Sequence, residues 1–362
     1  MTDFFAKIAA QYTNELPFVV YRKPNDTLVT TVFQKDSNVH YVNDYSESGF
    51  VFAPFDAVNK TVIIPFEECF TTDFNQGNNI DFSDVALNFS DVEKHKKLVT
   101  KGISEIHNTS LEKVVLSRVE EVTVQQISPI LLFQKALMEY SNAFVYLWFH
   151  PEIGCWLGAT PEVLLTTRNN HFKTMALAGT QVFSDALTWE DKEQEEQQIV
   201  TDYIAHNLSS EQLDFQVGEP YTVKAGHLAH IRTDISGSFK SNNLQQLLSV
   251  LHPTPAVCGM PKQEAKEFIM ANEEYNRTFY TGFLGELNKS TQRKNNRRNT
   301  ENNAYRFISK TSELYVNLRC MELQKNSTKI YVGGGITASS DPEKEFIETC
   351  NKTKTMKKLI IS

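Results

Sequence analysis

The sequence of 362 residues contains few cysteines, and no two of them are close together. The five cysteines are scattered, and none shows the Cys-x-x-Cys spacing of a zinc site. An odd number of distant cysteines also does not indicate a disulfide framework. We therefore expect reduced thiols and no structural zinc.

The sequence also lacks an excess of positive charge and long apolar runs. The net charge is −8 and the sequence pI is near 5.7, which argues against a nucleic-acid surface because phosphate binding needs a basic face. The one basic cluster, residues 293–298, is interpreted as a solvated hairpin loop. No segment reaches the roughly eighteen apolar residues of a membrane span, and the N-terminus does not resemble a signal peptide. We expect a cytoplasmic protein with neither nucleic-acid nor membrane partners.

The sequence has no internal repeat and no proline- or glycine-rich linker, which favours a single domain over residues 1–362. Short runs of β-branched and aromatic residues outnumber the crossovers of a doubly wound sheet. This predicts an α+β fold, with antiparallel β-sheets around a buried pocket and helices packed outside. Strands are expected at residues 18–21, 28–33, 50–53, 61–64, 113–118, 144–150, 163–167, 172–178, 279–287 and 314–320. Helices are expected at residues 91–107, 129–140, 189–208, 243–251, 262–275 and near the C-terminus.

The C-terminal helix follows a strand that ends in three glycines, residues 333–335. Ser340 followed by Pro342 and Glu343 is typical of a helix start. From there Glu345, Glu348 and Lys352 follow at spacings of three and four and share one face of the helix. Such a stripe can hold a metal ion and an anion together. The alternative is an exposed helix with an ordinary Glu–Lys pair.

A second helix, over residues 189–208, carries Glu193 and Glu196 one turn apart. Ile199, Val200 and Tyr203 lie on the same side as Glu196, which predicts that Glu196 points inward. An inward carboxylate is costly without a cation, so a bound metal is one explanation and a boundary glutamate that reaches solvent is the other. Together with the two glutamates of the C-terminal helix, these carboxylates suit Mg²⁺.

Four single residues are further candidates. Lys113 opens an apolar strand and would be a base if desolvated, or else a solvated strand-end lysine. Glu162 lies in a tight turn that enters a strand, where a site residue is held rigidly, although a plain turn carboxylate fits the pattern as well. His230 is a hydrogen-bond donor to an anion or a structural histidine. Arg319 suits bidentate carboxylate binding if it faces inward.

With further short motifs, these residues resemble the chorismate-utilising enzymes and, within them, the isochorismate synthases. The matching segments are residues 113–118 (KVVLSR), 157–162 (LGATPE), 177–180 (LAGT), 230–233 (HIRT), 251–256 (LHPTPA) with Gly259 and Pro261, 280–282 (YTG), 318–320 (LRC), 333–335 (GGG) and 340–352. They occur in the family's order across the motif-bearing portion, residues 89–362, whereas residues 1–88 resemble its variable N-terminal portion.

The resemblance implies a Mg²⁺-dependent conversion of chorismate to isochorismate, in which water adds at ring carbon C2 and the C4 hydroxyl departs. Lys113 would activate the water and Glu162 would protonate the leaving hydroxyl. The implied metal residues are Glu196 and Glu348, with Glu193 and Glu345 as further or water-mediated ligands. The implied substrate-binding residues are Gly179, Thr180, His230, Ala256, Tyr280, Arg319, Gly333, Gly335 and Lys352.

Two positions separate the subfamilies. Relatives that use ammonia typically lack lysine at the position of Lys113, so Lys113 indicates water as the nucleophile. Salicylate synthases keep this lysine, eliminate pyruvate, and tend to have threonine where this chain has Ala256. A salicylate synthase and a catalytically silent chorismate-binding subunit remain the alternatives.

The resemblance also carries expectations about partners and departures from the family pattern. We expect no obligatory amidotransferase partner and a monomer or weak homodimer, and the product would feed menaquinone or siderophore synthesis. The chain departs from the family at Ile231, where leucine is usual, and in the long basic segment 288–303.

Overall fold

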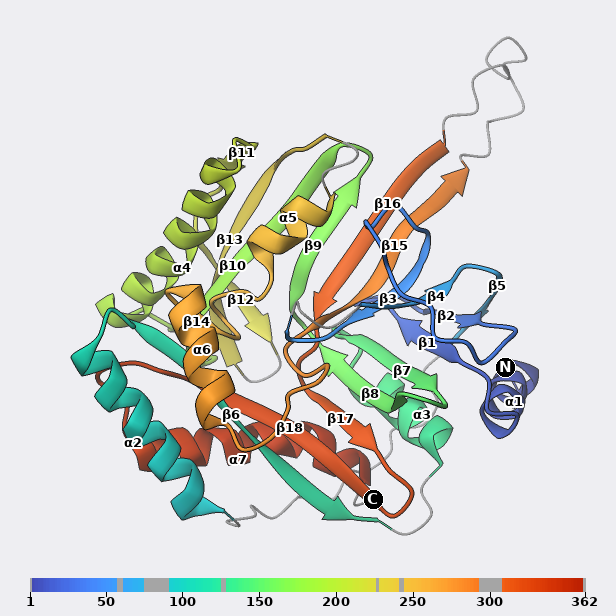
Figure 1. The fold of residues 1–362 in the computed structure, drawn as a ribbon, viewed down its shortest axis with the longest axis horizontal. Coiled ribbons are helices and arrows are strands. Elements are labelled where there is room, and N and C mark those ends of the chain that lie inside the picture. Colours follow the sequence, from blue (N-terminus) through green and yellow to red (C-terminus); the bar gives the residue numbers. More distant parts are fainter. Residues whose placement is uncertain are drawn as a thin grey trace.

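The computed structural model describes residues 2–56, 61–74, 91–124, 128–225, 228–240, 244–292 and 308–360. Two nine-stranded antiparallel sheets dominate it (Figure 1). The first sheet has the order β14 (Gly259–Met260), β6 (Lys113–Thr123), β18 (Ser327–Ile336), β17 (Cys320–Leu323), β8 (Gly154–Thr160), β7 (Phe144–His150), β1 (Phe18–Arg22), β2 (Leu28–Phe33), β5 (Glu68–Asp73). The second has the order β11 (Asp214–Val217), β13 (Leu228–Ser238), β10 (His171–Val182), β9 (Val163–Arg168), β16 (Ile308–Val316), β15 (Phe283–Gln292), β3 (Gly49–Ala53), β4 (Val62–Pro65), with β12 (Tyr221–Ala225) paired to β13.

Helices cover the outer faces of the sheets (Figure 1). They are α1 (Thr2–Thr13), α2 (Val92–Asn108), α3 (Pro129–Glu139), α4 (Asp191–Ser210), α5 (Leu244–Leu251), α6 (Lys262–Asn272) and α7 (Pro342–Ile360). Helix α7 packs on β18 and on α2, whereas α4 packs on β10 and β13. The predicted α+β class with antiparallel sheets is confirmed. In the described part of the chain, no helix has the length and apolar character needed to cross a membrane.

An aromatic layer joins the two sheets. Phe52 of β3 stacks on Phe279 with 4.2 Å between ring centroids, and Phe144 of β7 stacks on Tyr315 of β16 at the same distance. These side chains belong to one buried cluster with residues of β1 and β8. Burying large aromatic rings is the largest single source of hydrophobic stabilisation, so this layer fixes the two sheets face to face.

Several predicted boundaries are wrong. The strand predicted at residues 279–287 begins only at Phe283, because Thr278 and Thr281 adopt left-handed backbone conformations that turn the chain. The strand predicted at 314–320 is interrupted between β16 and β17, where Arg319 has a φ of 48°. Left-handed residues cannot continue a strand. Helix α1 and strands β5, β8, β11, β12, β13 and β14 were not predicted at all.

Candidate active site

Lys113 stands at the start of β6 and is only 7% exposed. Its Nζ lies 2.8 Å from Oε1 of Glu196 on α4, so the two form an ion pair between the sheet and the helix. A Cβ at Gly335 on the adjacent strand β18 would lie 2.9 Å from the Lys113 Cε. Glycine at this position therefore makes room for the lysine side chain, and of the two alternatives for Lys113 the structure has the buried one, not the solvated one.

Glu162 lies in the connection between β8 and β9 and is 9% exposed. Its backbone carbonyl accepts the amide N–H of Val316 at 3.0 Å, and its own amide donates to Thr160 Oγ1 at 3.3 Å. Burial raises the pKa of the Glu162 carboxyl to about 7, and the nearby charge of Lys113 opposes this rise. A buried carboxyl with this pKa can donate a proton near neutral pH.

Gly179 sits at an irregularity in the β10–β13 pairing and has a φ of +67°. A Cβ there would lie 3.1 Å from the Cβ of Glu193, so α4 approaches the strand most closely at this glycine. The Glu193 Oε2 is buried and has no hydrogen-bond partner among the described residues. A buried acceptor without a partner is unfavourable unless a cation or a water satisfies it.

The buried face of α4 matches the predicted one only in part. Val200 is buried as predicted and Gln197 is buried too, whereas Ile199 is 44% exposed and Glu196 lies half-buried at the edge. The prediction that Glu196 and Ile199 both point inward is therefore wrong for Ile199. The sequence of α4 is mostly polar, which gives a weak apolar pattern for choosing a face.

His230 on β13 is half-buried and pairs across the sheet with the backbone of Thr180 on β10. Its Nδ1–H donates to the carbonyl of Gly179 at 3.3 Å. Burial lowers the pKa of His230, and this hydrogen bond opposes the lowering. The charges of Arg319 and Lys352 also lower this pKa while Glu196 raises it, so all three lie in its surroundings. The side chain of Thr180 is outside the described part of the chain.

Arg319, Tyr280 and Gly333 form the other side of this region. The Arg319 guanidinium donates from Nη1 to Thr355 Oγ1 at 3.1 Å. Tyr280 is 3% exposed, and burial raises the pKa of its hydroxyl while the cations of Arg277 and Arg319 oppose the rise. A Cβ at Gly333 would lie 3.1 Å from the Tyr280 hydroxyl.

Helix α7 begins differently from the prediction. The side chain of Asp341, not Ser340, caps it by accepting the Lys344 amide at 2.9 Å, while Ser340 Oγ donates to Glu345 Oε1 at 2.7 Å. The predicted Ser340–Glu343 capping box is therefore wrong, because Asp341 is an equally good cap one residue later. A Cβ at Gly334 would lie 3.2 Å from Glu345 Oε2.

Lys352 connects α7 to β18. Its Nζ donates to the Gly333 carbonyl at 2.8 Å and lies 2.6 Å from Oε1 of Glu348. The Glu–Lys pair of the simpler interpretation is thus present, and it lies against the glycine run. Ala256 is half-buried and precedes Val257 in the segment before β14.

The four glutamates fit Mg²⁺ by donor type, since all are carboxylates, and Glu193 Oε2 lacks a protein partner among the described residues. Two of them face lysine ammonium groups, as Glu196 faces Lys113 and Glu348 faces Lys352. Within the described ranges, however, no three His, Cys, Asp or Glu side chains are grouped closely enough to hold a metal ion. The metal set therefore stays a prediction.

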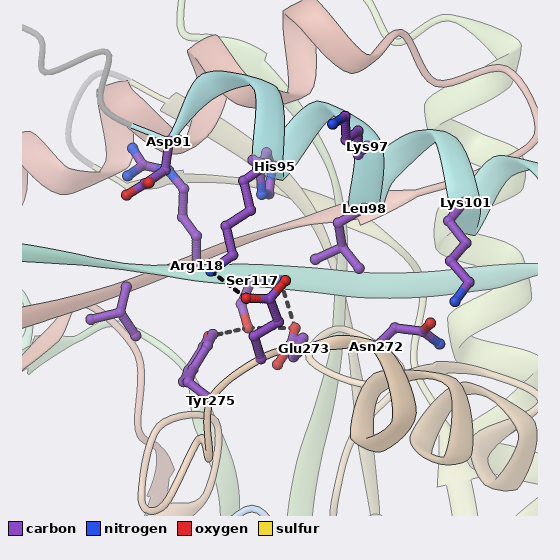
Figure 2. Close-up of a pocket in the computed structure, with 13 residues that line it drawn as sticks. Asp91, His95, Lys97, Leu98, Lys101, Ser117, Arg118, Asn272, Glu273 and Tyr275 are labelled. Atoms are coloured by element: carbon purple, nitrogen blue, oxygen red, sulfur yellow. Dashed lines mark hydrogen bonds and ion pairs between the residues drawn. The ribbon is translucent and has the colours of Figure 1, made fainter.

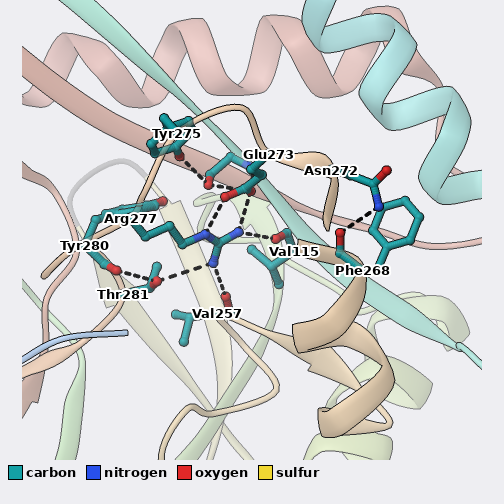
Figure 3. Close-up of polar contacts among 10 residues, drawn as sticks. Val115, Val257, Phe268, Asn272, Glu273, Tyr275, Arg277, Tyr280 and Thr281 are labelled. Atoms are coloured by element: carbon teal, nitrogen blue, oxygen red, sulfur yellow. Dashed lines mark hydrogen bonds and ion pairs between the residues drawn. The ribbon is translucent and has the colours of Figure 1, made fainter. Parts of the chain in front are cut away.

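Sequence reasoning missed a buried polar cluster beside β6. Glu273 and Arg277 form an ion pair there, and Glu273 also accepts from Ser117 (Figure 3). The i,i+4 spacing of the two charges was a visible signal, but their contact with β6 is not local in sequence. Glu273 and Ser117 also line a cavity of about 400 Å³ between α2, β6 and the segment after α6 (Figure 2). None of the predicted site residues lines this cavity.

Comparisons with known proteins show the family of the chain. Residues 68–294 match the model of the chorismate binding enzyme family, and residues 305–358 match a second model of the same description. The chain is 29% identical to the isochorismate synthase MenF of Escherichia coli over 278 residues, which is 73% of this chain and 58% of that protein. It is 28% identical to the isochorismate synthase DhbC of Bacillus subtilis, over 73% of this chain and 67% of that protein.

Among solved structures, the chain is similar to a protein assigned as the 2,3-dihydroxybenzoate-specific isochorismate synthase DhbC of Bacillus anthracis. The TM-score is 0.76 at 25% identity, covering 98% of this chain and 99% of that one. The chain spans about 58 to 67% of the length of the curated relatives named above.

Proposed function

The chain belongs to the chorismate-binding enzyme family, and from that premise we propose that it is an isochorismate synthase. It would convert chorismate reversibly to isochorismate, by adding water at C2 with loss of the C4 hydroxyl. The observation that carries the proposal is a buried pair of ionisable groups, Lys113 and the neutral-pH acid Glu162, within this family's framework. The similarity to isochorismate synthases over most of the chain supports it.

In this proposal Glu162 is the general acid. Its pKa of about 7 leaves a large protonated fraction at neutral pH, which the departing hydroxyl requires. Lys113 is the general base that takes a proton from the attacking water. Its ammonium group is held by Glu196, so Lys113 must lose a proton before it can act.

The anionic substrate would be bound by groups on both sides of the site. Arg319, Tyr280 and the backbone near Gly333 and Gly335 would hold the enolpyruvyl carboxylate. His230 would contact the substrate near the ring. Arg319 and His230 are half-buried and Tyr280 is buried, which strengthens their attraction for an anion.

The ring carboxylate lies on the metal side of the proposed site. Mg²⁺ held by Glu196 and Glu348, with Glu193 and Glu345 as further or water-mediated ligands, would supply positive charge to this carboxylate. The backbone at Gly179 and Thr180, together with Lys352, would orient the same carboxylate.

Product identification tests the proposal. Purified protein incubated with chorismate should form isochorismate with Mg²⁺ and lose this activity with a chelator. Glu162→Gln should lower kcat by about 10²- to 10⁴-fold. The wild-type kcat should fall as the pH rises through about 7, because Glu162 then loses the proton it donates. Absence of any conversion under these conditions would refute the activity.

The same chromatogram separates the two remaining alternatives. Salicylate and pyruvate as products would make the protein a salicylate synthase, which Ala256 argues against. Tight chorismate binding without any turnover would instead indicate a catalytically silent subunit.

A further inference from the structure

The ion pair of Glu273 and Arg277 is deeply buried, with each side chain 2% exposed (Figure 3). The guanidinium contacts both carboxylate oxygens, at 2.6 Å from Nη2 to Oε1 and 2.7 Å from Nε to Oε2. This is a bidentate pair, the most directional of protein ion pairs. Its orientation is therefore well defined, and whatever else it binds is held in a fixed geometry.

The remaining donors of Arg277 reach three separate segments. Nη2 donates to the Val115 carbonyl on β6 at 2.7 Å. Nη1 donates to the Val257 carbonyl at 3.0 Å and to Thr281 Oγ1 at 3.3 Å. One rigid guanidinium thus bonds a sheet strand and two loops at once, which a lysine ammonium on a flexible stem cannot reproduce.

Glu273 holds β6 a second time. Its Oε1 accepts both the amide N–H and the hydroxyl of Ser117, each at 2.7 Å. The Ser117 hydroxyl in turn lies 2.6 Å from the Tyr275 hydroxyl. The strand is therefore held at two main-chain positions along the same edge, two residues apart.

Each bonded position is next to a residue of the proposed active site. Val115 is two residues from Lys113, Val257 follows Ala256, Thr281 follows Tyr280, and Ser117 pairs across the sheet with Gly333.

We propose that Glu273 and Arg277 are positioning residues that hold the base lysine and the carboxylate-binding residues at a fixed separation. The inference rests on the proposed function. Burial of an ion pair is weak evidence of stability, and holding one conformation is its better-supported role. A displacement of about 1 Å in such a site can lower the rate by about 10²-fold. Loss of the pair should therefore lower turnover, although neither residue is proposed to contact the substrate.

Arg277→Lys tests the proposal, with Arg22→Lys as the matched control. Arg22 is also buried, at 3% exposed, and also donates to main-chain carbonyls, those of Leu137 and Tyr140. Neither carbonyl belongs to a proposed site residue. Arg277→Lys should lower kcat by about 10²-fold, and the control should leave it nearly unchanged. Both are compared at equal folded fraction, measured by circular dichroism.

A second variant tests the geometry directly. Glu273 lines the cavity of Figure 2, so a small cation can approach its carboxylate after the arginine side chain is removed. In Arg277→Ala, free guanidinium at low concentration should restore part of the lost kcat, whereas methylammonium should not, because only guanidinium presents the planar fork. Equal responses to the two cations would overturn the proposal.

Two further results separate this inference from the proposed function. If Arg277→Lys loses no more kcat than Arg22→Lys, the pair is only structural and the inference fails while the function stands. If the wild type makes no isochorismate, chorismate affinity measured by calorimetry replaces kcat. The inference then requires Arg277→Lys to bind chorismate about tenfold more weakly than the control, as expected when polar groups are misplaced.

Discussion

Helices α4 and α7 each carry two of the four glutamates predicted to hold the metal, yet they are anchored to the protein differently. Beneath α7 buried charged anchors are added to apolar ones such as Phe346, Met356 and Leu359. Lys357 of α7 pairs with Glu120 of β6, and Arg118 donates from Nε to Thr349 Oγ1 at 2.9 Å. All four side chains are buried.

Beneath α4 the anchors are mostly apolar. Val200, Ile204 and Leu208 are at most 4% exposed and pack into the second core cluster. The polar exceptions are Thr201 and Gln197, and the Gln197 amide donates to the Ala176 carbonyl at 3.2 Å, to Thr233 Oγ1 at 3.0 Å and to Thr201 Oγ1 at 3.3 Å.

This difference has a physical consequence for the site. Directional bonds to buried charges fix a helix in position and rotation, whereas apolar contact is non-directional and tolerates small shifts. We therefore interpret α7 as the fixed half of the metal-binding region and α4 as the half that adjusts.

The largest change in kcat is expected to distinguish the two lysines that form ion pairs with glutamates of these helices. Lys113→Ala removes the proposed base together with the partner of Glu196, and should lower kcat by about 10²- to 10⁴-fold. Lys352→Ala removes the partner of Glu348 and should act mainly on KM. Steady-state kinetics on both variants checks this. Equal losses of kcat would contradict the assignment of Lys113 as the base.

The next largest effect is expected on stability, from substitutions of the buried side chains that hold α7 and α4 to the sheets. Glu120→Gln leaves the buried Lys357 without its counter-charge and should cost about 3–5 kcal/mol. Gln197→Met beneath α4 removes neutral hydrogen bonds to Ala176, Thr201 and Thr233 and should cost about 1–3 kcal/mol. Denaturant unfolding of the two variants measures the difference. The comparison fails if the α4 variant is the less stable of the two.

Acidification should lower the folding stability through a buried histidine beside α7. His95 is 3% exposed beside the Phe346 ring of α7, and burial with the charge of Arg118 lowers its pKa to about 4. Between pH 6.5 and 4 the unfolded chain binds a proton that the folded one does not, so stability falls as the pH falls. Glu162 acts in the opposite direction, since its folded pKa of about 7 favours the folded state as the pH falls towards 4.5.

His95→Gln removes the first of these contributions. Relative to wild type, it should gain up to about 3 kcal/mol on going from pH 7 to pH 4. Unfolding free energies at several pH values check this, with the exposed His107→Gln as control. A parallel pH profile for wild type and His95→Gln would show that His95 does not act on stability in this way.

The smallest effect is expected from replacing two glycines, one beside each helix, with alanine. Gly179→Ala puts a side chain at a φ of +67° and 3.1 Å from the Glu193 Cβ, which should cost about 1–2 kcal/mol and displace α4. Gly334→Ala meets only the mobile end of Glu345 at 3.2 Å and should cost less. Melting temperatures and the Mg²⁺ concentration for half-maximal rate measure both. Similar shifts in the two variants would remove the distinction between the helices.

The sequence predicted the fold class, and it named two buried candidates of the proposed site for identifiable reasons. Lys113 begins an apolar strand and Glu162 lies in a turn between two strands, so both positions were recognisable locally. Three features escaped prediction. The buried face of α4 was partly misassigned because its sequence is mostly polar, and the cap of α7 was misplaced because Ser340 and Asp341 are equivalent candidates.

The third feature, the cluster of Glu273 and Arg277, escaped because its bonds to β6 join residues more than 150 positions apart. No periodicity or local motif reports such contacts. The i,i+4 spacing of opposite charges indicated only a helix-surface pair, whereas both side chains are buried.

The strand order of the first sheet has a consequence for how the protein is made. Strands β17 and β18 lie between β6 and β8, although they are the last two strands of the chain (Figure 1). While a ribosome is still synthesising residues before 320, β6 and β8 have no neighbour on their facing edges. Unpaired edges favour association with other chains. A polypeptide truncated before β17 should therefore aggregate, and a nascent one should need a chaperone until β17 and β18 have been synthesised.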